Sequence, residues 1–173
     1  LWTAASCAVR SPSRLDRDIH VPWSALADPV PAGLPTYVLD GGDEVRSEIA
    51  MVYELGYRAQ LTPVVSFSAT LFRADYDHLR SQETHPSGTY LFYANGMEGK
   101  TSGLEMWGSY QAAPNWRLSA GATFLDMDLR RKPDSTDTNG AAALGNDPSH
   151  QWQLRSNFDI TPRHEFDLMI RRV

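Results

Sequence analysis

The sequence predicts an all-β fold, an antiparallel up-and-down meander that forms part of a transmembrane β-barrel. Two observations predict it: apolar and polar residues alternate with a period of two along seven segments, and short connections alternate strictly with long ones. Period two is the pattern of a strand with one apolar and one polar face. A barrel in an outer membrane has tight turns on one side and long loops on the other, whereas a soluble sandwich has no reason to sort its loops in this way.

The seven segments define the expected strands, and almost no helix is expected. They span 1–10, 47–59, 65–79, 90–112, 116–129, 149–160 and 165–173. Short proline-containing links lie at 60–63, 113–115 and 161–164, and long polar connections at 11–46, 81–89 and 130–148. Asn95-Gly96 is a strong signal for a two-residue hairpin, but a hairpin there would put Pro63 and Pro114 on opposite sides of the barrel. We therefore predict one strand over 90–112 with an irregularity at Asn95–Gly99.

Two of the expected strands change phase partway. The apolar positions move from odd to even at Leu71–Phe72, and from even to odd at Phe124–Leu125. A one-residue slip turns every later side chain to the other face, so a β-bulge at each point is one interpretation. The other is that each strand leaves the membrane there and continues as a wall above it. The sequence leaves both open.

The two faces of the strands predict which residues meet lipid. A charge that faces lipid near mid-bilayer costs about 2–4 kcal/mol, so the polar face must line the lumen. Residues expected to face the lumen are Glu54, Arg58, Glu105, Arg155 and Asn157. Residues expected to face lipid are Leu55, Tyr57, Leu104, Tyr110, Leu118, Leu154 and Phe158. An aromatic girdle at the periplasmic boundary is expected from Tyr57, Trp116, Phe158 and Phe166, beside the short turns.

Composition argues against several classes of function. A formal net charge of −5 gives no basic footprint, so no nucleic-acid partner is expected. The single cysteine, Cys7, excludes an internal disulfide and is predicted to be a buried, inert thiol. The five histidines form no His-x-x-x-His pair, and no Gly-x-Ser-x-Gly motif is present. The sequence therefore predicts no protein-bound metal, no cofactor and no enzymatic activity.

Four groups of residues then carry a resemblance. These are Trp2–Arg14 with its Ser6, Ala8 and Arg10-Ser-Pro12; Tyr53–Arg58 followed by Ser68–Asp77; Asn95–Gly99 leading to Gly103–Glu105; and Gly145–Gln151. In this order and at this spacing they resemble TonB-dependent outer-membrane receptors over essentially the whole chain. Cys7 departs from the pattern, since the family often has arginine there, which weakens any role for a lumen charge at this position.

The resemblance implies the bacterial outer membrane and a 22-stranded barrel, of which residues 1–173 would be about seven strands. It also implies an N-terminal plug domain, absent here, through which the TonB complex drives uptake of a scarce nutrient such as a ferric siderophore. Because the chain starts at Leu1 without methionine and stops inside an apolar run at Val173, we expect a fragment truncated at both ends. The alternatives are a small eight-stranded outer-membrane barrel and a soluble β-sandwich binding module.

The long first loop holds the candidate ligand-binding residues. They are Arg10, Arg14, Arg17, His20 and Trp23. Guanidinium groups pair bidentately with carboxylates, which suits an anionic siderophore. The loop also carries six acidic residues, so it is not basic overall.

Overall fold

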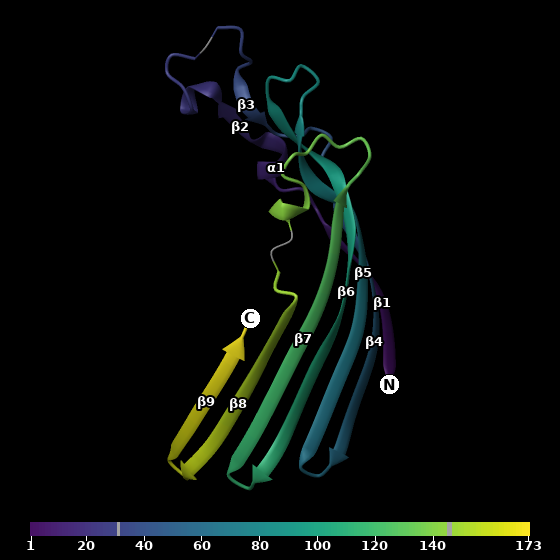
Figure 1. Ribbon diagram of the computed structural model, residues 1–173, viewed down its shortest axis with the longest axis vertical. Coiled ribbons are helices and arrows are strands. Elements are labelled where there is room, and N and C mark those ends of the chain that lie inside the picture. Colours follow the sequence, from purple (N-terminus) through teal and green to yellow (C-terminus); the bar gives the residue numbers. More distant parts are fainter. Residues whose placement is uncertain (31, 145–146) are drawn as a thin grey trace.

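The computed structural model describes residues 1–30, 32–144 and 147–173, and it shows an elongated antiparallel sheet with short turns at one end and long loops at the other (Figure 1). Each long strand pairs with its neighbours in sequence, in the order β1-β4-β5-β6-β7-β8-β9. The bounds are β1 Trp2–Arg10, β4 Glu48–Thr62, β5 Val65–Thr84, β6 Leu91–Ala113, β7 Trp116–Arg131, β8 His150–Thr161 and β9 His164–Arg172. The predicted meander of seven segments is confirmed.

The first loop contains structure that the sequence analysis did not anticipate. Strand β2 (His20–Pro22) pairs with β3 (Tyr37–Asp40), and β3 adds to β6 in parallel through Leu39 and Leu91. The helical elements are short: α1 Arg14–Asp18, η1 Trp23–Ala25 and η2 Gly140–Ala143. Within the described ranges, no helix is long and apolar enough to cross a membrane.

The pairing register gives the sheet one apolar and one polar face. Leu55 pairs with Leu71, which pairs with Leu104, whereas the neighbouring Thr70 pairs with Glu105. Partners in a ladder point to the same face. By this rule all seven residues expected to face lipid share the apolar face, and all five expected to face the lumen share the polar face.

Of the two interpretations of the phase changes, the pairing excludes the β-bulges. Pairing runs without a register shift through Leu71–Phe72 and through Phe124–Leu125. Beyond these points the apolar face of β5 and β7 carries charged residues. The polar face carries apolar residues there, such as Met127 and Leu129, which line a cavity together with Leu144. The geometry agrees with the second interpretation, a wall above the membrane whose outer face meets water and whose inner face packs under the loops.

The expected irregularity in the fourth segment is confirmed. Strand β6 continues through Asn95-Gly96 without a hairpin, and its register with β5 shifts between Tyr76 and Leu79 and again between Leu79 and Ser81. Two shifts of opposite sense restore the original register. The sheet therefore keeps its alternation while bending locally at the loop end.

Three of the four aromatic residues predicted to form the girdle lie together beside the short turns. The Trp116 and Phe158 rings meet edge to face at 6.3 Å, and Phe158 pairs with Phe166. Tyr57 pairs with Ala69, well up the strand from the Thr62–Val65 turn, so it does not belong to this cluster.

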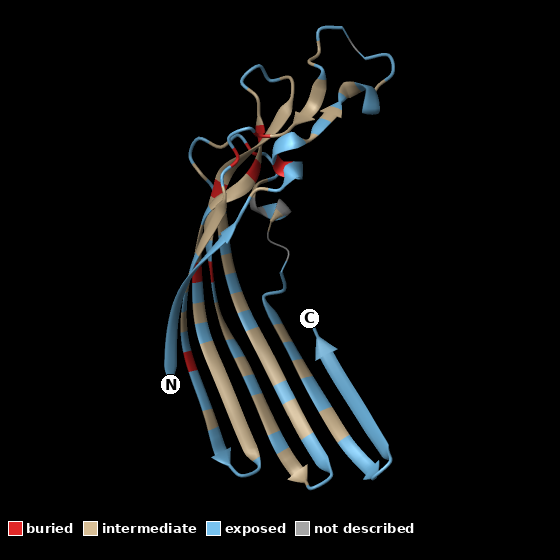
Figure 2. Ribbon diagram, turned by 180° about the vertical axis from the view of Figure 1, so that it is seen from behind, coloured by how far each residue is buried: buried red, intermediate tan, exposed pale blue. Residues whose placement is uncertain are grey.

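The buried residues gather at the loop end (Figure 2). Met97 is completely buried there, with Val45 and Ala74 close to it in exposure. Cys7 is exposed, so the prediction of a buried thiol is wrong. The reason is that β1 is an edge strand, which has a neighbour on one side only.

Candidate functional site

Three buried carboxylates tie the long loops to the sheet. Asp16, Glu83 and Asp137 expose 1%, 7% and 4% of their surface, although each is an acidic residue in or beside a loop. A buried carboxylate is tolerated only where hydrogen bonds or a counter-charge compensate for lost hydration. Each of the three has such partners.

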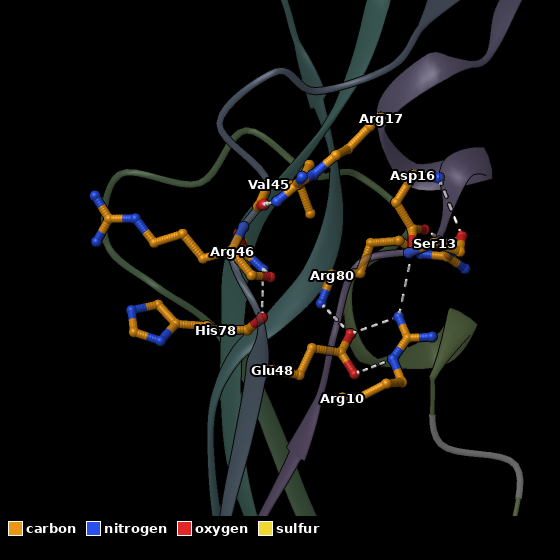
Figure 3. A network of polar contacts seen from close by, with 10 residues as sticks. Arg10, Ser13, Asp16, Arg17, Val45, Arg46, Glu48, His78 and Arg80 are labelled. Atoms are coloured by element: carbon orange, nitrogen blue, oxygen red, sulfur yellow. Dashed lines mark hydrogen bonds and ion pairs between the residues drawn. The ribbon is translucent and has the colours of Figure 1, made fainter.

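Asp16 anchors the first loop (Figure 3). Ser13 caps helix α1 in a capping box: its hydroxyl oxygen accepts from the Asp16 backbone N–H at 3.2 Å, and its backbone N–H donates to the Asp16 carboxylate at 2.8 Å. The Ser13 hydroxyl also donates to that carboxylate at 2.8 Å. From β5, the Arg80 guanidinium donates to the other carboxylate oxygen at 2.8 Å. Helix α1 is thereby fixed to the barrel wall rather than left in solvent.

The Asp16 anchor is ionised at all physiological pH values. Burial alone would raise the pKa of Asp16, but the hydrogen bond from Arg80 and those from Ser13 outweigh it and lower the pKa from 3.8 to about 2. Glu48 extends the network, since it accepts from Arg10 at 2.7 Å and from the Arg80 backbone N–H at 2.9 Å.

Two glycines close the base of the first loop. A Cβ at Gly41 would overlap the Arg17 carbonyl oxygen, and one at Gly42 would overlap the carbonyl oxygen of Tyr93 on β6. Gly42 also donates its backbone N–H to the Asp16 carbonyl at 3.0 Å. Glycine is required here because the loop's backbone lies directly against α1 and β6.

Glu83 anchors the loop that follows β7. Its carboxylate accepts hydrogen bonds from the hydroxyls of Ser81 and Ser135 and from the hydroxyl and backbone N–H of Thr136. A Cβ at Gly96 would overlap this carboxylate, so the Asn95-Gly96 pair serves close approach rather than a hairpin turn.

Asp137 completes this second anchor. Its carboxylate accepts from the backbone N–H groups of Gln82, Asn139 and Gly140 at 2.7–2.9 Å. Burial would raise the pKa of Asp137, but these hydrogen bonds outweigh it and lower the pKa below its ordinary value. With its oxygens engaged by backbone donors, Asp137 holds a turn.

We expect Glu83→Gln to loosen the loop at 132–139. The glutamine amide keeps one acceptor oxygen, but its NH₂ group faces the Ser81, Ser135 and Thr136 groups that now donate to the carboxylate. Hydrogen bonds to a charged group are worth about 1.5–3 kcal/mol, and the variant loses that charge. Trypsin should cut the full-length variant after Arg130 or Arg131 faster than the parent, while Glu165→Gln beside the last short turn leaves cleavage unchanged. Equal cleavage of both variants would show that Glu83 does not hold the loop.

A cleft of about 540 Å³ opens between the base of the first loop and the tips of β5 and β6. Its lining mixes rings with charges of both signs: Asp40, Asp43, Glu44, Arg46, His78, His85, Tyr90, Phe92, Tyr93 and Lys132, with Gly41, Gly42, Ala94 and Asn95. The His85 and Tyr90 rings stack at 4.3 Å. The volume lies within the usual range for small-molecule sites.

Asn95 sets the shape of this cleft. Its side-chain oxygen accepts from the Arg46 backbone N–H at 2.6 Å, and its side-chain nitrogen donates to the Arg46 carbonyl and to the carbonyl of His78. One amide thus joins the first loop to β5 and β6. In the described part of the chain, no group of three His, Cys, Asp or Glu residues is arranged to hold a metal ion.

The structure does not bring the five predicted ligand-binding residues together in this cleft, because none of them lines it. Arg10 pairs with Glu48, and Arg17 donates to the Val45 carbonyl at 3.3 Å, so both support the loop base. Arg14 pairs with Asp18 on exposed α1. His20 pairs with Asp40, and its ring centroid lies 4.9 Å from that of Tyr37. Trp23 begins η1, and its indole nitrogen is buried and has no hydrogen-bond partner among the described residues.

The polar face below the loops carries its own ion pairs. Asp167 accepts from Arg155 at 2.7 Å and from Asn157 at 2.6 Å. Glu105 lines a separate cavity of about 410 Å³ on this face. The predicted Gly145–Gln151 segment lies partly outside the described residues, at 145–146.

Comparisons with known proteins agree with this architecture. The family model described as TonB dependent receptor-like, beta-barrel matches residues 16–169. No curated protein sequence matches the chain. Among solved structures, the siderophore receptor PirA from Pseudomonas aeruginosa is similar with a TM-score of 0.64 and 15% identity, over 98% of this chain and 30% of that one.

Two further solved structures share the fold. The FrpB iron transporter from Neisseria meningitidis (F3-3 variant) aligns with a TM-score of 0.63 and 14% identity, over 77% of this chain and 20% of that one. The copper transporter OprC aligns with a TM-score of 0.58 and 14% identity, over 92% of this chain and 21% of that one. The chain therefore spans about a fifth to a third of the length of the proteins that it matches.

Proposed function

Because this chain belongs to the TonB-dependent receptor family, whose barrels lie in the bacterial outer membrane and are not enzymes, we propose that the full-length protein imports a scarce nutrient, and that this nutrient is a ferric siderophore. The seven long strands form one part of a single barrel domain, and the remaining strands and an N-terminal plug belong to the rest of the protein. The TonB complex acts on that plug.

One observation carries the proposal: a membrane-height apolar face lies below a loop layer that is held in place rather than mobile. On β7 the apolar-face positions run from Trp116 to Phe124, which is about 25 Å of strand at 3.3 Å per residue. Above it, Asp16 and Glu83 fix two loops to the wall. Preorganised loops capture a ligand with a smaller entropic cost than disordered ones.

The cleft lining favours an organic chelate over a bare metal ion. Aromatic rings such as Tyr90, Phe92 and Tyr93 supply apolar contact, and Arg46 and Lys132 supply positive charge for anionic oxygens. We propose that the cleft and the first loop contact the ligand in turn, with Arg14 acting from α1, and His20 and Trp23 acting beside the loop tip at 24–35. Arg10 and Arg17 support the loop instead.

The test removes the tip and leaves both ends anchored. In the full-length receptor, residues 24–35 are replaced by a short Gly-Ser linker. This replacement preserves the Asp16–Arg80 pair and the close approach of Gly41 and Gly42 to α1 and β6. We expect normal surface levels and about tenfold slower uptake of radiolabelled ferric siderophore, since about 1.4 kcal/mol of lost binding is a tenfold change. Cobalamin and copper uptake serve as the other substrate arms.

Arg14→Ala and Arg163→Ala form a matched pair for the same assay. Both remove one arginine, but Arg163 lies in a short turn at the opposite end of the sheet. Only Arg14→Ala should slow siderophore uptake. Unchanged siderophore uptake at normal surface levels in the loop variant would contradict the proposal, and a selective loss of copper uptake would replace the substrate.

A further inference from the structure

Two tryptophans lie on the polar face of the sheet, away from the girdle at the short turns. Trp2 pairs with Gly56 on β4, and Trp107 pairs with Gly121 on β7. Gly121 is next to Ala120, so Trp107 lies at mid-bilayer height but on the water-filled side. Contact with lipid therefore explains neither ring. Both remain well exposed, Trp2 at 41% and Trp107 at 42%.

Each indole lies flat on the glycine with which it pairs. A Cβ at Gly56 would overlap the Trp2 ring, and one at Gly121 would overlap the Trp107 ring. Glycine is required beneath both rings because they lie directly against the backbone of the sheet. A ring that lies flat on the wall turns one whole face toward the lumen, and this arrangement occurs twice.

Hydroxyl and amide groups cover the wall around the two rings. Thr70 pairs with Gly56, and Ser68 pairs with Trp107, so the rings lie in neighbouring rows of the ladder. The cavity of about 410 Å³ on this face has its uncharged polar lining from Ser68, Thr70, Thr123, Gln151 and Gln153, beside Trp107. Its charged lining residues, Glu105 and Arg171, have opposite signs. The volume is that of a small-molecule site, and the lining has no net charge.

We propose that this cavity and the two indoles form a second binding site for the transported ligand, on the inner wall of the barrel, and that the site takes the uncharged organic part of a chelate. The inference rests on the import of a chelate proposed above. Rings or amide groups of the ligand stack on the Trp107 indole, while the wall hydroxyls and amides bond to its carbonyl and N–H groups. Trp2 holds the other end of the ligand, since β4 and β7 are about 14 Å apart at three strand spacings.

A second site on the wall favours completion of transport. A ligand that leaves the loop layer and finds no site in the lumen returns to the loops more often than it crosses. The rings and hydroxyls of the wall hold it at mid-height instead. Because the lining carries no net charge, the ligand is not trapped there by an ion pair.

The test separates surface binding from import in cells that carry the full-length receptor. The probe is a radiolabelled ferric trihydroxamate, a chelate whose organic part is a chain of amides. Trp2→Ala/Trp107→Ala should bind the probe as the parent does in energy-depleted cells. In energised cells it should import the probe about tenfold more slowly, because two stacking contacts of the size measured for aromatic pairs together amount to about one power of ten.

Two further variants separate the rings from the fold. Trp2→Phe/Trp107→Phe keeps a ring at each position and should recover most of the rate. Trp116→Ala removes a ring beside a short turn on the apolar face and should import at the parent rate, at equal surface levels.

Two glycines give a matched pair that leaves every ring in the chain. Gly121→Ala displaces the Trp107 ring from the wall and should slow import about threefold, since one of two stacking contacts is disturbed. In Gly108→Ala the new Cβ meets the Ser66 carbonyl oxygen at an ordinary contact distance of 3.5 Å. This variant should import as the parent does.

Import by Trp2→Ala/Trp107→Ala at the parent rate would overturn the proposal. Weaker binding of the probe in energy-depleted cells would also overturn it, because the rings would then serve the outer site. A lower thermal midpoint with unchanged import per folded receptor would show that the rings pack against the plug instead. A parent receptor that neither binds nor imports the probe would contradict the proposed function itself, on which this inference rests.

Discussion

Replacing Asp16 with asparagine will release the first loop from the barrel wall. Asparagine keeps the shape of the side chain but loses the charge that holds Arg80, and it presents a donor to groups that themselves donate. The lowering of the Asp16 pKa from 3.8 to about 2 comes from Arg80 and from Ser13 on the same helix, so the share that docks the loop is at most about 2 kcal/mol at neutral pH. A loop docked by a few kcal/mol would then be open for a measurable fraction of the time.

The pH dependence of docking gives this prediction a second readout. The docked carboxylate has a pKa of about 2, below the ordinary value of 3.8, and we expect the pKa to rise toward that value when the loop undocks. Its contribution is therefore complete above pH 4, decreases as the pH falls toward 2, and is absent below that. Backbone hydrogen exchange of residues 13–18, corrected for intrinsic rates, should speed up through this range in the parent receptor.

The Asp16→Asn variant should exchange rapidly at every pH, without the transition between pH 4 and pH 2. Asp18→Asn is the matched control, because Asp18 lies on the same helix but, within the described ranges, pairs only with exposed Arg14. It should behave as the parent does. A parent receptor whose exchange at residues 13–18 does not change between pH 5 and pH 2 would show that the Asp16 carboxylate is not the anchor.

The strands were predictable because each depends on a local pattern. Alternation sets the faces, and the order of short and long connections sets the topology, so even the Asn95-Gly96 dipeptide could be placed inside one strand. The sequence could not decide between a bulge and a wall above the membrane at Leu71–Phe72 and Phe124–Leu125. Both give the same phase change, and only the pairing between strands, which continues there without a shift, separates them.

The anchors in the loop layer were not predictable in the same way. Asp16 and Arg80 are 64 residues apart, and Glu83 and Thr136 are 53 apart, so no local pattern connects them. The capping box at Ser13 and Asp16 was a readable signal for a short helix. The contacts of Arg10 with Glu48 and of Arg17 with the Val45 carbonyl join residues that are far apart in the sequence, so the sequence could not indicate them either.

Leu154→Arg should destabilise the full-length barrel by about 2–4 kcal/mol, the cost of arginine facing lipid near mid-bilayer. Leu154 pairs with Ala120, which is the middle of the apolar-face positions between Trp116 and Phe124. Arg155→Leu, one residue further, should have a much smaller effect, because Asp167 keeps its hydrogen bond from Asn157 on the polar face. Reversible folding into lipid vesicles, followed by urea titration, measures both free energies.

Ile160→Arg provides the control for depth. Ile160 follows Phe158 on the same face of β8 and lies next to the short turn, where arginine costs about 0–1 kcal/mol. Single cysteines at 154 and 155 add an independent readout with a membrane-impermeant maleimide, since only position 155 should be reached from the water-filled side. Equal reactivity at the two positions, or equal free energies for Leu154→Arg and Ile160→Arg, would mean that the apolar face does not contact lipid as assigned.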